Sequence, residues 1–160
     1  LGDVYKRQVL GDFLNEKNCT SMEYIKQLLQ GKFPAAPKFS VMISHVKDIA
    51  KAHVLSLKNK TAGGRRLIVG SEVRSILELS QIMAKNIPSH AKKLPKRELP
   101  NFMVKLLSYI DTSAKTMVPD LGLEMQTDQT YAEDILQMKF IASEIAVVDA
   151  AKSVIRLNLA

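Results

Sequence analysis

Histidine and cysteine are the side chains in this chain that could support metal or nucleophilic chemistry. The chain has three histidines, His45, His53 and His90, and one cysteine, Cys19. A zinc site needs several such ligands close together, and a serine–histidine–acid triad needs a histidine that an acid orients. The spacing indicates neither arrangement, so we predict no metal site. We expect His53 to be a buried core residue and His90 to lie in an exposed loop.

His45 stands where a predicted strand passes directly into a predicted helix. Residues 41–43 form an apolar, partly β-branched run of strand length. Ile49, Ala52 and Leu55 then recur at helical spacing. A side chain at such a junction can bond to backbone groups at the helix start. We therefore predict a structural, helix-capping role for His45 rather than a chemical one.

Further elements are indicated by caps and periodicity. The capping-box pattern Ser/Thr-x-x-Glu occurs in the pairs Thr20 and Glu23, Ser75 and Glu78, and Thr130 and Glu133. We also predict a strand over 66–69, a helix between Phe102 and Ile110, and a last helix over 143–157 with Ile145, Val148, Ala151 and Ile155 on its buried face. Helices outnumber the few short strands. That imbalance favours part of a larger α/β fold.

Size and composition are those of a single globular domain. The chain has 160 residues, of which 46% are hydrophobic and 24% charged. The net charge is +7, but the lysines are scattered, and 6% aromatic residues without tryptophan give little material for base stacking. The sequence has neither an apolar run of membrane-spanning length nor a signal peptide. We predict a cytoplasmic protein with no nucleic-acid and no membrane partner.

The strand–helix segment resembles a known family. His45–His53, His-Val-Lys-Asp-Ile-Ala-Lys-Ala-His, is similar to the His-Val-Asp-Asp-Val-Ala-x-Ala-His segment of the extended short-chain dehydrogenases/reductases. Within that superfamily it looks most like the dihydroflavonol reductase and NAD-dependent epimerase group. Val9–Phe13, Tyr24–Gly31 and Leu99–Leu107 follow in the order of the family's carboxy-terminal half. The resemblance covers about residues 9–160.

The resemblance implies a fold and an activity. The fold would be α/β, the carboxy-terminal part of a Rossmann-type enzyme, with the last sheet strands and a mostly helical substrate lobe. Residues 1–8 are interpreted as a non-native leader and residues 9–160 as the substrate-binding part. The parent enzyme would use NADP or NAD to reduce an aldehyde, ketone or similar small carbonyl compound by hydride transfer. Homodimerisation of the full-length protein is left open.

The resemblance also implies particular site residues. Val9 matches the loop that passes the nicotinamide, and Ser21 matches a hydroxyl near a helix start that contacts the cofactor phosphates. A helix amino terminus favours an anion there. The alternative for Ser21 is a second capping hydroxyl beside Thr20. Met42 and Ile43 match the strand on the substrate side, and their alternative is ordinary core packing.

The family's catalytic and dinucleotide-binding motifs are absent from this sequence. A tyrosine and a lysine spaced Tyr-x-x-x-Lys would share one helix face and act as acid–base pair. The residues four after the tyrosines are Val9, Leu28, Ser113 and Ile135, and none is lysine. No Gly-x-Gly-x-x-Gly turn occurs either. We therefore predict no catalytic residue here and no hydride transfer by this chain alone.

Two other functions remain open from the sequence. The first is a sugar-nucleotide epimerase or dehydratase of the same superfamily, which the basic residues around the carboxy-terminal lobe would suit. The pattern over 99–122 favours the reductase group. The second is a non-catalytic basic binding module. Such a module should present one continuous positive face, and the scattered lysines argue against it.

Overall fold

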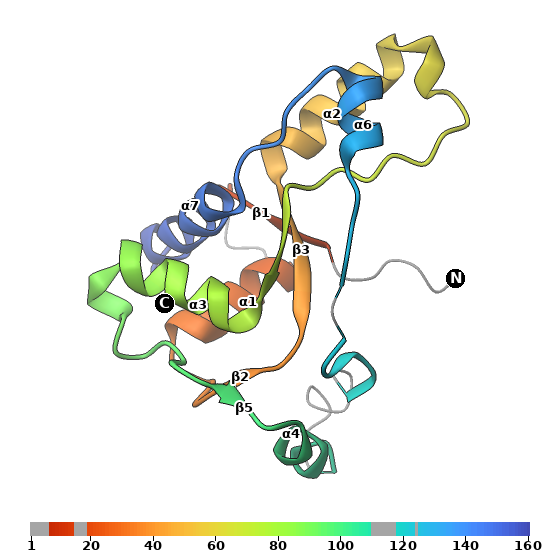
Figure 1. The fold of residues 1–160 in the computed structure, drawn as a ribbon. Coiled ribbons are helices and arrows are strands. Elements are labelled where there is room, and N and C mark those ends of the chain that lie inside the picture. The colour runs from red at the N-terminus through yellow and green to blue at the C-terminus, as the bar shows by residue number, and fades with distance from the viewer. Residues whose placement is uncertain (1–6, 15–18, 110–117, 124) are drawn as a thin grey trace.

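A computed structural model describes residues 7–14, 19–109, 118–123 and 125–160 of the chain (Figure 1). Over these residues a small mixed sheet combines with helices. The α-helices are α1 (Thr20–Leu29), α2 (Val46–Lys58), α3 (Ile76–Asn86), α4 (Asn101–Leu107), α6 (Thr130–Leu136) and α7 (Ser143–Arg156). The 3-10 turns are η1 (Lys60–Ala62), η2 (Pro88–His90) and η3 (Val118–Asp120). Within the described ranges, no helix is long and apolar enough to cross a membrane.

The main sheet has three strands in the order β1-β3-β4. β1 (Arg7–Leu10) runs parallel to β3 (Ser40–His45), and β4 (Glu72–Ser75) runs antiparallel to it. A second, minimal sheet joins β2 (Ala36–Pro37) to β5 (Glu98–Leu99) in parallel. The proline-rich segment around β2, which its prolines predict to be a loop, therefore contributes a two-residue strand. The observed class is α/β, as predicted.

β1 begins before the boundary that the sequence predicts for the native chain. Arg7 pairs with Met42 and Gln8 pairs with Ile43 in the parallel ladder with β3. These two residues of the proposed leader therefore take part in the sheet. Residues 1–6 lie outside the described part of the chain.

The main core lies between the sheet and three helices on one side of it. Helix α7 packs against α1 and against α3, and it also packs on β1 and β3 (Figure 1). Their buried apolar side chains form one cluster. Its fully buried members include Leu10, Met22, Ile25, Leu28, Ile43, Ile76, Leu79, Met83, Val147 and Val154. This burial is what fixes the three helices over the sheet.

The buried face of α7 is the predicted one except at Ile145. Ile145 is 51% exposed, whereas Ala146, Ala150 and Ala151 are completely buried. Because each residue advances about 100° around a helix, an error of one position moves the face by more than a quarter turn. The small alanines let α7 lie close to the sheet and to α1 and α3. Val148 and Ala151 are buried as predicted, and Ile155 is half-buried.

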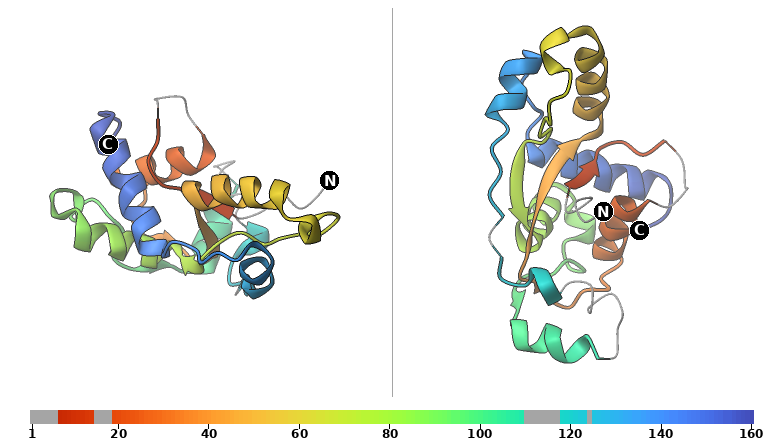
Figure 2. Two further views of the ribbon diagram at one scale, coloured as in Figure 1. Left: turned by 90° about the horizontal axis from the view of Figure 1, so that it is seen from above. Right: turned by 90° about the vertical axis from the view of Figure 1, so that its right-hand side faces the viewer.

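A second, smaller core joins α2 to α6 at one end of the molecule (Figure 2). Its buried members are Ala52, Val69, Leu136 and Met138. Ile49 and Leu55 of α2 pack against them, so the apolar stripe predicted for α2 is the face that packs into this core. The predicted core histidine of this helix, His53, is exposed instead, and its Nδ1 lies 2.7 Å from the Ile49 carbonyl oxygen.

The predicted strand over 66–69 is wrong, because the strand lies later in the chain, at β4. Residues 65–70 form neither a strand nor a helix. Val69 and Leu67 instead pack into the second core. The Ser44 hydroxyl donates to the Val69 carbonyl oxygen at 2.7 Å, and the Ser71 amide donates to Ile43 at 2.8 Å. These bonds tie the segment to β3 before the true ladder begins.

One of the three predicted capping boxes forms as expected. Ser75 accepts from the Glu78 amide, and the Glu78 carboxylate accepts from the Ser75 amide at 2.7 Å. At α1 the N-cap position is Cys19, without a side-chain cap, so Thr20 lies inside the helix. At α6 the Asp128 carboxylate accepts from the Thr130 amide at 2.9 Å, and this replaces the predicted box.

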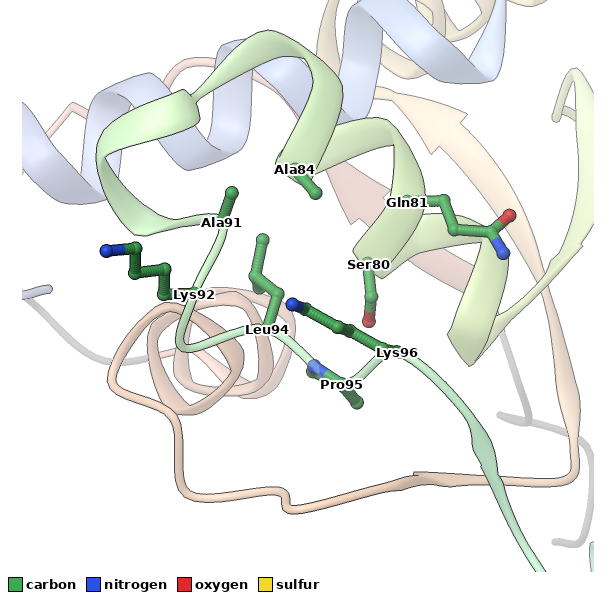
Figure 3. A pocket seen from close by; sticks show the side chains of 8 residues that line it. All are labelled: Ser80, Gln81, Ala84, Ala91, Lys92, Leu94, Pro95 and Lys96. Carbon is green, nitrogen blue, oxygen red and sulfur yellow. The ribbon is translucent and has the colours of Figure 1, made fainter.

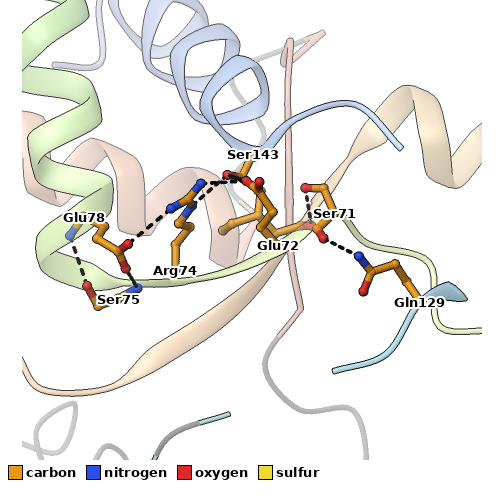
Figure 4. Close-up of polar contacts among 8 residues, drawn as sticks. Ser71, Glu72, Arg74, Ser75, Glu78, Gln129 and Ser143 are labelled. Atoms are coloured by element: carbon orange, nitrogen blue, oxygen red, sulfur yellow. Dashed lines mark hydrogen bonds and ion pairs between the residues drawn. The ribbon is translucent and has the colours of Figure 1, made fainter. Parts of the chain in front are cut away.

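A polar network beside the Ser75 box joins β4 to α3 and α7 (Figure 4). The Arg74 guanidinium donates to Glu72 at 2.8 Å, to Glu78 at 3.2 Å and to the Ser143 hydroxyl at 3.0 Å. Ser143 also donates to Glu72. The Ser143 and Arg74 hydrogen bonds hold the pKa of the Glu72 carboxyl below its usual value. The network thus links the edge strand β4 to two helices of the main core.

Candidate functional site

The two residues predicted to contact a cofactor line one pocket. Val9 comes from β1 and Ser21 from the first turn of α1. The pocket has a volume of about 260 Å³. We call it the candidate pocket. Its lining residues are Val9, Leu10, Gly11, Asp12, Phe13, Cys19, Ser21 and Val46.

The candidate pocket lies at the carboxyl end of a parallel strand pair. β1 ends at Leu10 beside the end of β3 at His45, and both chains leave the sheet there. In open α/β sheets, ligands bind in the crevice outside the carboxyl ends of the parallel strands. The pocket therefore occupies the part of the sheet where such a fold places its chemistry.

The amino terminus of α1 faces the same pocket. The N-cap residue Cys19 makes no side-chain cap, and both Cys19 and Ser21 line the pocket. The first amides of a helix lack intrahelical acceptors and carry partial positive charge, which favours an anionic ligand. Ser21 adds a hydroxyl that can donate to such a ligand. This arrangement suits a phosphate.

The loop of residues 11–13 forms one wall of the candidate pocket and is held by α7. We call these residues the pocket loop. The Phe13 amide donates to the Ser153 hydroxyl at 2.8 Å, and Arg156 donates to Asp12 at 2.8 Å and to the Phe13 carbonyl oxygen at 3.0 Å. The Arg156 hydrogen bond holds the pKa of the Asp12 carboxyl below its usual value. Neither Ser153 nor Arg156 was indicated as a site residue by the sequence.

Both the backbone conformation and the surroundings of position 11 require a glycine there. Its φ of +131° is rarely adopted by residues with a side chain, and an added Cβ would lie 2.8 Å from Val46 Cγ1. The same Cβ would lie 3.2 Å from Cε1 of the His45 ring. The pocket loop therefore rests directly on the junction between β3 and α2.

His45 caps α2, as predicted. It is the N-cap residue, is buried, and accepts from the Lys47 amide at Nδ1 over 3.1 Å. Its Nε2 lies 3.4 Å from Oδ2 of Asp149 on α7. His90 is half-buried rather than exposed, with Nδ1 3.0 Å from the Ser89 hydroxyl. Over the described residues, no group of three potential metal ligands comes together.

The two residues predicted to line the substrate side are both buried. Ile43 has no exposed surface and belongs to the main core. Met42, on the opposite face of β3, is 2% exposed and packs against Gly70, where a Cβ would lie 2.9 Å from its sulfur atom. Neither lines the candidate pocket. Here their side chains serve core packing, the alternative that the sequence left open.

A second cavity of similar size lies between α3 and the segment 91–96 (Figure 3). Its volume is about 270 Å³. Ala84, Ala91, Leu94 and Pro95 give it an apolar lining, with Lys92 and Lys96 as its basic residues. It contains none of the residues predicted to bind cofactor or substrate. We therefore place the candidate site at the candidate pocket.

Comparison with known proteins supports the resemblance seen in the sequence. No family model matches the chain. A segment of 82 residues is 29% identical to tetraketide alpha-pyrone reductase 2 of Arabidopsis thaliana. That segment covers 51% of this chain and 25% of the plant protein, so the chain matches a minor part of that relative's length.

Solved structures match nearly the whole chain. Gre2 of Candida albicans in complex with NADPH superposes with a TM-score of 0.68 at 21% identity, over 93% of this chain and 41% of that one. UDP-glucuronic acid 4-epimerase of Bacillus cereus, in complex with a sugar nucleotide and NAD, gives 0.62 at 17%, over 94% and 43%. This chain therefore has the fold of a part of these enzymes and spans less than half of their length.

Proposed function

We propose that residues 9–160 are the carboxy-terminal, substrate-side part of an NAD(P)-dependent reductase of small carbonyl compounds. The observation that carries this proposal is the meeting of Val9 and Ser21 in one pocket at the carboxyl end of β1. The two residues are implied by separate segments of the family resemblance. Their convergence beside the uncapped start of α1, at the carboxyl ends of parallel strands, matches the place where ligands bind on an open α/β sheet.

Each side of the candidate pocket has a distinct part in binding the dinucleotide. Val9, Leu10 and Val46 would offer apolar contact to the nicotinamide ring. Ser21 and the first amides of α1 donate hydrogen bonds to phosphate oxygens. A bound nicotinamide cofactor would supply the hydride for the carbonyl carbon of the substrate. Met42 and Ile43 support the strand behind the substrate from within the core.

The group that would donate the proton and the glycine-rich turn that is the main pyrophosphate-binding element are not in this sequence. The Tyr-x-x-x-Lys pair and the glycine-rich turn are absent from residues 1–160. We propose that both belong to a preceding part of the same protein, with residues 1–8 as a non-native leader. The 160-residue chain is then expected to show no reductase activity. Homodimerisation and a cytoplasmic location remain proposals for the longer protein.

An epimerase or dehydratase acting on a sugar nucleotide is the second candidate. It is supported by the match to the Bacillus cereus epimerase, whose fold fits this chain almost as well as that of Gre2. The two activities differ in cofactor turnover. A reductase oxidises one NADPH for each product, whereas an epimerase restores its cofactor in every cycle. A basic binding module is the third candidate, and no particular observation in the structure favours it.

The first experiment is to read the genomic sequence upstream of the codon for Val9. We expect a glycine-rich turn near the start of the reading frame and a Tyr-x-x-x-Lys pair shortly before Val9. The longer protein, once expressed, should oxidise NADPH in the presence of aldehydes or ketones. A start codon adjoining Leu1 with no such motifs would overturn the proposal. Isomerisation of a sugar nucleotide without net NADPH loss would establish the epimerase instead.

Site residues are tested on the 160-residue chain by titration with NADP⁺ and amide NMR spectra. The amides of Val9 and Ser21 should shift, with a weak but saturable dissociation constant. Ser21→Ala should raise this constant about tenfold or more, because one hydrogen bond to a charged group is lost. Thr20→Ala, one residue earlier in the same helix turn, is the matched control and should leave it unchanged. Equal effects of the two substitutions would remove Ser21 from the site.

A further inference from the structure

His45 and Asp149 form a contact that the capping role of His45 does not explain. The His45 side chain is buried, whereas Asp149 on α7 is 37% exposed. Nδ1 of the ring already accepts from the Lys47 amide, so in the neutral ring the proton lies on Nε2. This is the nitrogen that lies 3.4 Å from the Asp149 carboxylate. Asp149 therefore orients the His45 ring through Nε2, while Nδ1 of the same ring caps α2.

The oriented ring is part of the surface that supports the pocket loop. Cε1 of His45, between the two ring nitrogens, is the atom that would lie 3.2 Å from a Cβ at Gly11. Gly11 in turn lines the candidate pocket between Val9 and Asp12. A rotation of the ring would therefore press on the pocket loop or leave a gap beneath it. The pair reaches the pocket through Gly11 without lining it.

Asp149 lies on the same face of α7 as two residues that bind the pocket loop. Asp149, Ser153 and Arg156 are spaced four and then three residues apart, which places them on one helix face. Ser153 bonds both the amide and the carbonyl oxygen of Phe13, at 2.8 and 3.1 Å. Arg156 bonds Asp12. One face of α7 therefore binds the pocket loop at Asp12 and Phe13 and contacts His45.

We propose that His45 and Asp149 are a positioning pair that holds the pocket loop in the conformation that receives a nicotinamide dinucleotide. The proposal rests on the proposed function, because it takes the candidate pocket to be the dinucleotide site. His45 acts through Gly11 and Asp149 acts through His45, so neither touches the ligand. The closing helix of the chain thereby contributes to a site whose lining residues lie more than a hundred positions earlier in the sequence.

The test replaces Asp149 by alanine in the 160-residue chain. Alanine keeps the helix and removes the carboxylate from a half-exposed position. Amide hydrogen exchange at Gly11 and Phe13 should become about threefold to tenfold faster, as expected for loss of one hydrogen bond. The dissociation constant for NADP⁺, read from the shifts of Val9, should rise by a similar factor. Asp149→Asn retains an acceptor oxygen and should restore most of both.

Glu144→Ala is the matched control, because it removes one negative charge from an exposed position on the same helix. It should change neither exchange at the pocket loop nor NADP⁺ binding. His45→Asn is a second variant, since its shorter side chain can still cap α2 but no longer reaches Asp149. It should reproduce the effect of Asp149→Ala while the amide of Lys47 stays protected.

The outcomes separate this proposal from the proposed function. Unchanged exchange at Gly11 and Phe13 in Asp149→Ala would overturn the positioning pair, whatever NADP⁺ does. Faster exchange with an unchanged NADP⁺ dissociation constant would also overturn it, because the loop would then be held without consequence for binding. Absence of any NADP⁺ shift in the unaltered chain would instead count against the candidate pocket as the dinucleotide site.

Discussion

The two cores of this chain differ in how many helices and strands enclose them. The main core is enclosed by the sheet and by α1, α3 and α7, which come from the beginning, middle and end of the chain. The second core lies between α2, α6 and the segment before β4, and is small. A site that must keep its shape is better placed beside the first, because a core closed from several sides relaxes little. The candidate pocket is located there.

A cavity-creating substitution in each core should give the largest difference in lost stability between the two cores. Leu28→Ala in the main core should lower the free energy of unfolding by about 2–5 kcal/mol, because surrounding helices cannot collapse into the space. Leu136→Ala in the second core should cost about 2 kcal/mol or less, because α6 can shift. Chemical denaturation measures both. Leu57→Ala, at an 89% exposed position, is the control. Equal losses at Leu28 and Leu136 would show that the two cores are equally rigid.

Substitutions at the helix caps compare the same two cores, with smaller expected losses of stability. Ser75→Ala removes the cap of α3 and should cost about 1 kcal/mol of global stability, because α3 is part of the main core. Asp128→Ala removes the corresponding bond at α6 and should mainly increase amide exchange within α6. Thr20→Ala is the control, since Thr20 is not an N-cap residue. A larger global loss for Asp128→Ala than for Ser75→Ala would reverse the comparison.

The smallest expected effect is a pH dependence carried by acids in both regions. The pKa values of Glu72 beside the main core and Asp128 at α6 are lowered, in both cases first by side-chain hydrogen bonds, from Ser143 and Thr130. A lowered folded-state pKa means stabilisation that is present above the unfolded-state pKa and lost as pH falls through the folded-state value. Unfolding curves between pH 7 and 3 should therefore show falling stability.

Substitution of each of these two acids tests which region carries the loss of stability at low pH. Glu72→Gln should flatten the dependence on pH of global stability, because Glu72 belongs to the network that joins β4 to α7. Asp128→Asn should flatten it less, because its carboxylate is exposed and bonds locally. A steeper dependence in Glu72→Gln than in the unaltered protein would contradict the lowered pKa.

Local features of this fold were predictable from particular residues. The apolar run 41–43 followed by the stripe of Ile49, Ala52 and Leu55 indicates β3 and α2, and His45 indicates the cap between them. Ser75 with Glu78 indicates the start of α3. These predictions hold because a strand, a helix stripe and a capping box are decided by residues within a few positions of one another.

Features that depend on distant segments were not predictable in this way. Leu67 and Val69 have the β propensity of a strand, but the second core takes their side chains and β4 forms after them. The same competition explains His53 on the exposed side of α2 and Ile145 on the exposed side of α7. Local propensity differences are small, and packing against a partner element outweighs them.

The sequence by itself determined the α/β class, the helix positions and the resemblance that implies Val9 and Ser21 as cofactor contacts, because these follow from local patterns and motif order. The tertiary structure decided that Val9 and Ser21 share one pocket and that Met42 and Ile43 are buried. It also decided that Ser153 and Arg156 hold the pocket loop and that Asp149 contacts His45. Such contacts join residues more than a hundred positions apart, and only the packing of α7 on the sheet brings them within hydrogen-bonding distance.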